Sequence, residues 1–205
     1  MNKFKFDPQK HHRPFDGAQG RRSIRLKGYD YASEGAYFIT MVTQGRECLF
    51  GKIVGGEMHL STYGEIIQKW WDEIPVHFPN VETGAFVIMP NHVHGVIFII
   101  SECRGEVISP GNETEEAISH PGCGTLPLCK PTLGQIVGYF KYQSTKEMNA
   151  VDNTGTITKF WQRNYYEHII RGEKELQQKT DYILDNPIRW EEDHEHVQNK
   201  NGWVQ

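Results

Sequence analysis

The 205-residue sequence lacks any run of roughly eighteen apolar residues, which is the length a membrane-spanning helix needs. Its first residues are polar and charged, without the apolar stretch of a secretory signal peptide. No CxxC pair is present, and the four scattered cysteines are expected to be free thiols: Cys48, Cys103, Cys123 and Cys129. We therefore expect a soluble, cytoplasmic protein with no membrane partner, no disulfide framework and no cysteine-bound metal.

A strong positive charge is also lacking, since the formal net charge is −4, which argues weakly against a nucleic-acid partner. The charge is unevenly spread, however, because residues 1–27 hold eight lysines and arginines against two aspartates. Such a basic arm can contact phosphates, or it can simply be a solvated terminal segment. Within it we single out Arg22 and Arg25 as candidate DNA contacts.

Two histidines one residue apart, His92 and His94, follow Met89-Pro90-Asn91 and precede an apolar run. Alternate side chains of a β-strand point to the same face, so the two imidazoles are expected to project together while Val93 points to the opposite layer. Two adjacent imidazoles are half of a metal site, but they can equally be histidines satisfied by hydrogen bonds. The HxH pattern alone leaves both interpretations open.

The order of the expected elements indicates an α+β protein with an antiparallel, ferredoxin-like sheet, packed helices and the HxH pair on a central strand. Residues 101–131 interrupt the pattern with Gly, Pro, Ser, Thr and Glu, which predicts an exposed insertion. The patterns predict strands over 35–43, 81–89, 92–100 and 160–171, a turn with a short pairing segment at 55–60, and helices over about 62–77, 132–150 and 173–186.

The last expected helix carries Tyr182 and Asn186, which are four residues apart and so lie on one helical face. An amide oxygen from Asn186 can complete a site with the two histidines. Imidazoles with an oxygen ligand suit Mg²⁺ or Mn²⁺ and leave open positions for a phosphate. The alternative is a half-buried core tyrosine and an asparagine that ends the helix before Pro187.

Three segments, taken together and in order, resemble the REP-associated tyrosine transposases, a branch of the HUH single-tyrosine transposases (His, hydrophobic residue, His). The resemblance covers about residues 23–190, which we expect to form the catalytic domain. The basic arm 1–22, the insertion 101–131 and the polar tail 191–205 fall outside it. The three segments are Met89 to His94, Phe160 to Arg171, and Asp181 to Pro187.

The resemblance implies a metal-dependent transposase: an endonuclease and strand transferase that acts on hairpin-associated single-stranded DNA through a 5′-phosphotyrosine intermediate. By matching position, it makes His92, His94 and Asn186 the ligands of a divalent Mg or Mn ion, and Tyr182 the nucleophile. Many relatives outside this branch have Gln where Asn186 stands, so this amide reaches less far. The resemblance leaves monomer and homodimer open, because relatives differ in whether the tyrosine helix serves its own subunit.

Tyr139 is a rival nucleophile, because Gln143 follows it at the same four-residue spacing. Position favours Tyr182, since the nucleophile of this class lies on the helix after the last core strand. His168 is either a donor that supports a metal ligand or an ordinary sheet histidine. The remaining candidate DNA contacts are Lys159, Arg163 and Arg171 for phosphates, and Tyr165 and Tyr166 for packing or base stacking.

Two further hypotheses remain open from the sequence. A domesticated DNA-binding protein would use the same sheet to hold a hairpin or single-stranded DNA without cleaving it. A metal-dependent phosphodiesterase would activate water in place of a tyrosine.

Overall fold

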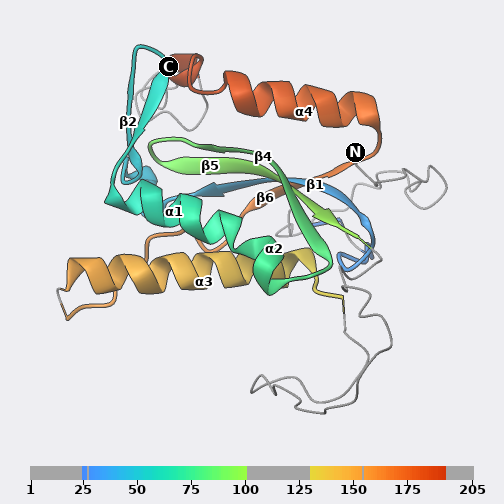
Figure 1. Cartoon of the computed structure of the whole chain (residues 1–205), viewed down its shortest axis with the longest axis horizontal. Coiled ribbons are helices and arrows are strands. Elements are labelled where there is room, and N and C mark those ends of the chain that lie inside the picture. The colour runs from blue at the N-terminus through green and yellow to red at the C-terminus, as the bar shows by residue number, and fades with distance from the viewer. Residues whose placement is uncertain (1–24, 27, 101–129, 154, 193–205) are drawn as a thin grey trace, which may run out of the picture.

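The computed structural model describes residues 25–26, 28–100, 130–153 and 155–192, as Figure 1 shows. The predicted basic arm with Arg22, nearly all of the predicted insertion 101–131 and most of the predicted tail 191–205 lie outside the described residues. Among the helices that are described, none is long and apolar enough to cross a membrane.

A four-stranded antiparallel sheet forms the centre of the protein, with strand order β4-β5-β1-β6. The two inner strands are β1 and β5, and β5 begins at the first histidine of the HxH pair. This confirms the predicted α+β, ferredoxin-like sheet with the two histidines on a central strand. The strands are β1 (Gly35–Val42), β4 (Val81–Ile88), β5 (His92–Ile99) and β6 (Tyr166–Ile170).

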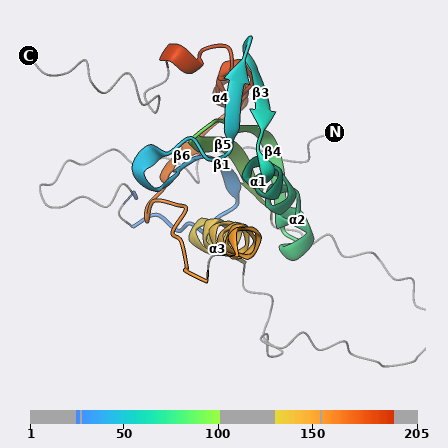
Figure 2. The ribbon, with the colours of Figure 1, turned by 90° about the vertical axis from the view of Figure 1, so that its left-hand side faces the viewer.

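Helices cover both faces of this sheet (Figures 1 and 2). One face carries α1 (Thr62–Asp72), α2 (Ile74–His77) and α3 (Leu133–Asp152), and the other carries α4 (Glu173–Asp185). A separate hairpin of β2 (Gly51–Val54) and β3 (Glu57–Leu60) confirms the predicted turn and pairing segment. Two 3₁₀ turns complete the described elements: η1 (Gln44–Arg46) and η2 (Trp190–Glu192).

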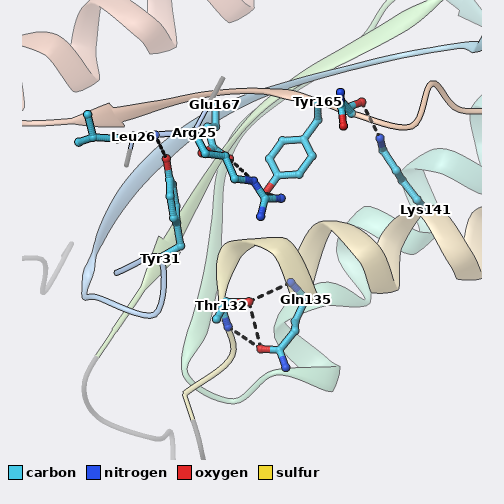
Figure 3. Close-up of polar contacts among 9 residues, drawn as sticks. Arg25, Leu26, Tyr31, Thr132, Gln135, Lys141, Tyr165 and Glu167 are labelled. Atoms are coloured by element: carbon cyan, nitrogen blue, oxygen red, sulfur yellow. Dashed lines mark hydrogen bonds and ion pairs between the residues drawn. The ribbon is translucent and has the colours of Figure 1, made fainter. Parts of the chain in front are cut away.

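Alternating side chains of the inner strands supply two separate hydrophobic cores. Tyr37, Ile39 and Met41 of β1 face α1 and α3 in the larger core, whereas Ala36 and Phe38 face α4 in the smaller one. The helices begin where the sequence predicts. Ser61 caps α1, and Thr132 with Gln135 forms a capping box on α3, which Figure 3 shows in detail.

The predicted strand over 160–171 is wrong in its first half, because β6 begins only at Tyr166. Phe160 and Trp161 are consecutive yet both pack in the larger core, whereas consecutive side chains of a strand point to opposite faces of the sheet. The Lys141 ammonium donates hydrogen bonds to the carbonyls of Gln162 and Asn164, at 2.9 and 3.0 Å. These carbonyls are therefore bonded to a side chain, and the segment crosses the end of the sheet as a loop.

The predicted helix over about 62–77 is also wrong in being continuous, since it divides at Glu73 into α1 and α2. Pro75 has no backbone N–H, so it cannot donate to the carbonyl of Trp71 four residues earlier. The N–H of Glu73 is shared between the carbonyls of Lys69 and Trp71 at the end of α1. The proline thus closes the first helix tightly and starts a short second one.

A candidate metal and tyrosine site

His92 and His94 lie side by side on the sheet face that α4 covers. Their Nε2 atoms are 3.0 Å apart, and both side chains are buried. Val93, between them in the sequence, points into the larger core on the other face. The strand geometry expected from the HxH pattern is therefore present.

The outer nitrogen of each imidazole is held by a polar neighbour. Thr40, which is paired with His94 across the sheet, places its Oγ1 2.7 Å from the Nδ1 of His94. Asn91 donates from Nδ2 to the carbonyl of Arg46, so its Oδ1, 2.8 Å from the Nδ1 of His92, accepts a hydrogen bond from that ring. His92 consequently carries its proton on Nδ1 and has a lone pair on Nε2, toward His94.

Burial keeps both imidazoles neutral at physiological pH. It lowers the pKa of His94 to about 3, and the charge of Lys179 acts in the same direction. The pKa of His92 is held well below its ordinary value by burial, by His94 and by Arg46. Neutral imidazole is the form that binds metal ions.

Two neutral imidazoles at this separation can share either one proton or one cation. Two ligand atoms that are each about 2.1 Å from the same ion, at a right angle, are about 3.0 Å apart from one another. The observed Nε2–Nε2 distance has this value. The pair therefore fits two adjacent positions of an octahedral ion as well as it fits a hydrogen bond.

Helix α4 brings Tyr182 to the same place. The Tyr182 ring centroid lies 5.2 Å from that of His94 and 6.0 Å from that of Phe38. Ile183, the next residue, is fully buried in the smaller core and anchors the helix to the sheet. Tyr182 itself is 39% exposed, so a ligand from solvent can reach the phenol.

Asn186 is buried at the end of α4, and its Nδ2 atom has no hydrogen-bond partner among the described residues. In the chain it lies between Tyr182, which contacts His94, and Trp190, whose ring centroid is 5.9 Å from that of His92. A 180° flip of the Asn186 side-chain amide exchanges its oxygen and nitrogen with little change in shape. The flip would place the oxygen where the unpaired Nδ2 atom lies. A cation is one group that would satisfy an oxygen there.

These donors can hold an ion only with help from a ligand or water. In the part of the chain that the structure describes, no group of three or more His, Cys, Asp or Glu side chains could bind a metal. The donor set is two imidazoles and one amide, which fits an ion with open positions for phosphate oxygens.

The rival Tyr139 lies in a different layer. It is on α3, where its ring stacks on His77 with centroids 3.9 Å apart and also contacts Trp70. Burial raises its pKa. Since α3 and α4 cover opposite faces of the sheet, Tyr139 is separated from the two histidines by the sheet itself (Figure 2).

The two neighbouring tyrosines predicted to stack on bases point in opposite directions. Tyr166 faces the α4 side, with its ring centroid 6.4 Å from that of Phe38, and is exposed. Tyr165 faces α3, where its hydroxyl accepts a hydrogen bond from Arg25 at 3.1 Å. Figure 3 shows Arg25 and Tyr165 together between the sheet and α3, beside the buried carboxylate of Glu167. This pair is therefore not at the histidine site.

The other predicted contacts surround β6. The Nε2 atom of His168 lies 2.6 Å from Oε1 of Glu175 on α4. The backbone N–H of Arg171 donates a hydrogen bond to the other oxygen of that carboxylate. His168 therefore connects β6 to α4 through Glu175. Lys159, Arg163 and Arg171 are exposed.

Five residues that surround the two histidines were not predicted to belong to this site. Asn91 could have been found, since it directly precedes His92, and Thr40 is a polar residue within an apolar strand. The others come from distant segments and carry no local signal. The five are Phe38, Thr40, Asn91, Lys179 and Trp190.

Comparison with known proteins finds relatives both in sequence and in structure, while no protein-family model matches the chain. A Haemophilus influenzae protein without an assigned function is 45% identical over 181 residues, covering 88% of this chain and 96% of that protein. A second protein of that organism, named as a REP-associated tyrosine transposase, is 25% identical over 167 residues, covering 78% of this chain and 74% of its own length.

One related structure is that of a REP-associated tyrosine transposase bound to a REP hairpin. It has a TM-score of 0.50 and 19% sequence identity, and the match covers 88% of this chain and 75% of that one. At this identity the likeness concerns the fold.

Proposed function

We propose, from the premise that this chain belongs with the REP-associated tyrosine transposases, that it is a transposase-like enzyme that nicks and joins hairpin-associated single-stranded DNA. One observation carries the proposal: a partly exposed tyrosine ring lies 5.2 Å from one of two buried, neutral imidazoles. The hairpin in the related structure supports the choice of DNA.

His92, His94 and Asn186 would hold a divalent Mg or Mn ion. When bound, such an ion neutralises charge on a phosphate oxygen and orients the phosphorus for attack. Thr40 and Asn91 hold the outer nitrogens of the imidazoles, and groups of this kind commonly set the orientation and basicity of ligand histidines.

Tyr182 is the proposed nucleophile. Its Oη forms a bond to phosphorus as the bond from phosphorus to the 3′ oxygen breaks, which leaves a 5′-phosphotyrosine and a free 3′-hydroxyl. The phenol proton passes to solvent, and the 3′ oxygen takes up a proton. A phenol ordinarily titrates near pH 10, so nearby positive charge that favours the phenolate assists the attack.

The joining step is the reverse reaction with a different strand. A 3′-hydroxyl attacks the phosphorus of the adduct, and Tyr182 leaves as the phenol after protonation. One phosphoester replaces another in each step, so no nucleotide cofactor is required.

One alternative is a protein that holds a hairpin without cutting it. The observation that favours it is the small donor set, since no cluster of three or more His, Cys, Asp or Glu is present among the described residues. Both functions predict DNA binding, and only the enzyme forms a covalent adduct.

The test uses the full-length protein and a labelled library of hairpin oligonucleotides with randomised single-stranded flanks. After incubation with Mn²⁺ or Mg²⁺, a denaturing gel reveals any covalent protein–DNA adduct. We expect adduct from the wild type and from Tyr139→Phe. Tyr182→Phe should reduce it by about 10³-fold or more, and EDTA should abolish it while hairpin binding persists.

Each other outcome identifies a different function. Binding without adduct in the wild type would support the non-cleaving alternative. Cleavage that survives in Tyr182→Phe would show that water is the nucleophile, as in a phosphodiesterase. Loss of the adduct in Tyr139→Phe alone would mean that the nucleophile lies on α3.

A further inference from the structure

Lys179 lies on α4 three residues before Tyr182, so both side chains project from the same side of the helix. The Lys179 ammonium is 4.7 Å from the ring centroid of Phe38. Lys179 is half-buried, which places its charge between the helix and the sheet at the edge of the histidine site.

The ring of Phe38 is contacted by the side chains of His94, Tyr182 and Lys179. His94 stacks on its ring with centroids 5.5 Å apart, and Tyr182 meets it edge-on at 6.0 Å. The ammonium of Lys179 is the third group around the same ring.

No carboxylate of the described segments forms an ion pair with Lys179, although other lysines have such partners. Lys69 lies 2.8 Å from Glu147, and Lys130 lies 2.9 Å from Glu34. The aromatic ring of Phe38 attracts the ammonium but cannot accept its N–H groups as a carboxylate or phosphate oxygen would. The ammonium is therefore held in place with donors available for an anion.

We propose that Lys179 is a catalytic residue that binds the reacting phosphate beside Tyr182. This inference rests on the proposed function, which supplies the phosphate and the nucleophile. A positive charge placed where negative charge develops on the phosphate oxygens stabilises the transition state more than the bound substrate. It also favours the phenolate form of an adjacent tyrosine.

The covalent step is unchanged by this addition. The bond from Tyr182 Oη to phosphorus forms, the bond from phosphorus to the 3′ oxygen breaks, and solvent exchanges both protons. Lys179 remains an ammonium throughout and acts through its charge and its hydrogen bonds to a non-bridging oxygen.

The first experiment measures the rate of adduct formation at saturating DNA, with an oligonucleotide recovered as adduct from the hairpin library. Lys179→Met should slow the reaction by about 10- to 1,000-fold, and Lys179→Arg should recover part of the rate. Lys146→Met is the matched control, because Lys146 is an exposed lysine on α3, and its rate should equal that of the wild type. Melting temperatures establish that each variant is folded.

The second experiment asks whether the lysine recognises the charge of that phosphate. In the non-reacting Tyr182→Phe background, binding is compared for two oligonucleotides that differ only in a neutral methylphosphonate at the mapped cleavage position. The protein with Lys179 should bind the neutral oligonucleotide about tenfold more weakly, whereas Lys179→Met should show a clearly smaller difference, because only the proposed metal ion is left to contact that charge. A purely structural lysine would not produce this difference.

The outcomes separate this proposal from the function on which it rests. A wild type that forms no adduct overturns both. The role of Lys179 alone is overturned if the wild type forms adduct and Lys179→Met does so at the same rate. It is also overturned if Lys179→Met discriminates between the charged and the neutral oligonucleotide as strongly as the protein with Lys179.

Discussion

Burial determines the protonation of the histidine pair. Without neighbours, an imidazole titrates near pH 6.5, but His94 in the folded protein has a pKa of about 3, mainly because its charged form would be buried. Thr40 and Asn91 occupy the outer nitrogens, so the two Nε2 atoms are the ones that face each other. The same features that make these residues poor bases at neutral pH make them available as metal ligands.

A dependence of stability on pH follows from this shift. Between a folded-state pKa of about 3 and an unfolded value near 6.5, the unfolded chain binds more protons than the folded protein. His94 therefore contributes full stability above pH 6.5, and this contribution is lost as the pH falls toward 3. We expect the free energy of unfolding of the metal-free protein, measured with urea, to fall by about 1 kcal/mol per pH unit for each such histidine once the unfolded imidazole is charged.

The effect of His94 on the free energy of unfolding is best measured between about pH 6.5 and 5, where most carboxylates remain ionised. His94→Asn removes the titrating group and should reduce the slope of stability against pH in this range, while His92 retains its share. An unchanged slope in the variant would show that His94 is not neutral in the folded protein.

At the scale of elements, the centre of β5 is constrained from the face opposite the histidines. Gly95 packs against the ring of Trp71, which itself stacks on Phe86 with centroids 4.1 Å apart. A Cβ atom at position 95 would meet Cη2 and Cζ2 of Trp71, the latter at 2.7 Å, and Trp71 is buried and cannot move freely. The glycine thus lets α1 approach the strand that carries the HxH pair.

Gly95→Ala should therefore destabilise the protein by about 1–3 kcal/mol through overpacking, measured by urea unfolding. Gly138→Ala is the matched control. Gly138 lies on an exposed position of α3 where an added Cβ meets nothing within 4 Å, so the same change should stabilise by up to about 1 kcal/mol. Equal effects at the two positions would contradict the packing argument.

The element patterns show which predictions local sequence can support. Sequence periodicity predicted the beginnings of α1 and α3 and the two strands β4 and β5 correctly, because these depend on neighbouring residues. The segment before β6 was predicted as a strand from its alternating pattern, but it is a loop whose carbonyls bond to Lys141 from a distant helix. The residue order gives no sign of such a partner.

At the scale of the whole molecule, the helices on the two faces of the sheet are packed against it by hydrophobic cores of different size. The larger core joins α1, α2 and α3 to the sheet, whereas α4 rests on a smaller cluster that includes Phe38, Val96 and Ile183. A further tie is the contact between His168 and Glu175, at 2.6 Å. The helix that carries Tyr182 therefore has fewer buried apolar contacts to lose when it moves.

Native-state hydrogen exchange should detect this difference. We expect amides in the last turns of α4 to exchange about tenfold faster or more than those in the middle of α3, because local opening requires less buried surface to be exposed. Glu175→Gln, which removes the charge at the tie to His168, should accelerate exchange in α4 and leave α3 unchanged. Equal protection of both helices would contradict a separately opening α4.

What the sequence by itself determined about this protein is local in origin. Strand periodicity places His92 and His94 on one face, helix periodicity places Tyr182 and Asn186 on one side of α4, and the motifs in order point to a family of relatives. Only the tertiary structure decided that α4 covers the face with the histidines, that Tyr139 and Tyr165 lie on the other, and that Lys179 meets Phe38. These relations depend on packing between segments far apart in the chain, which no local spacing encodes.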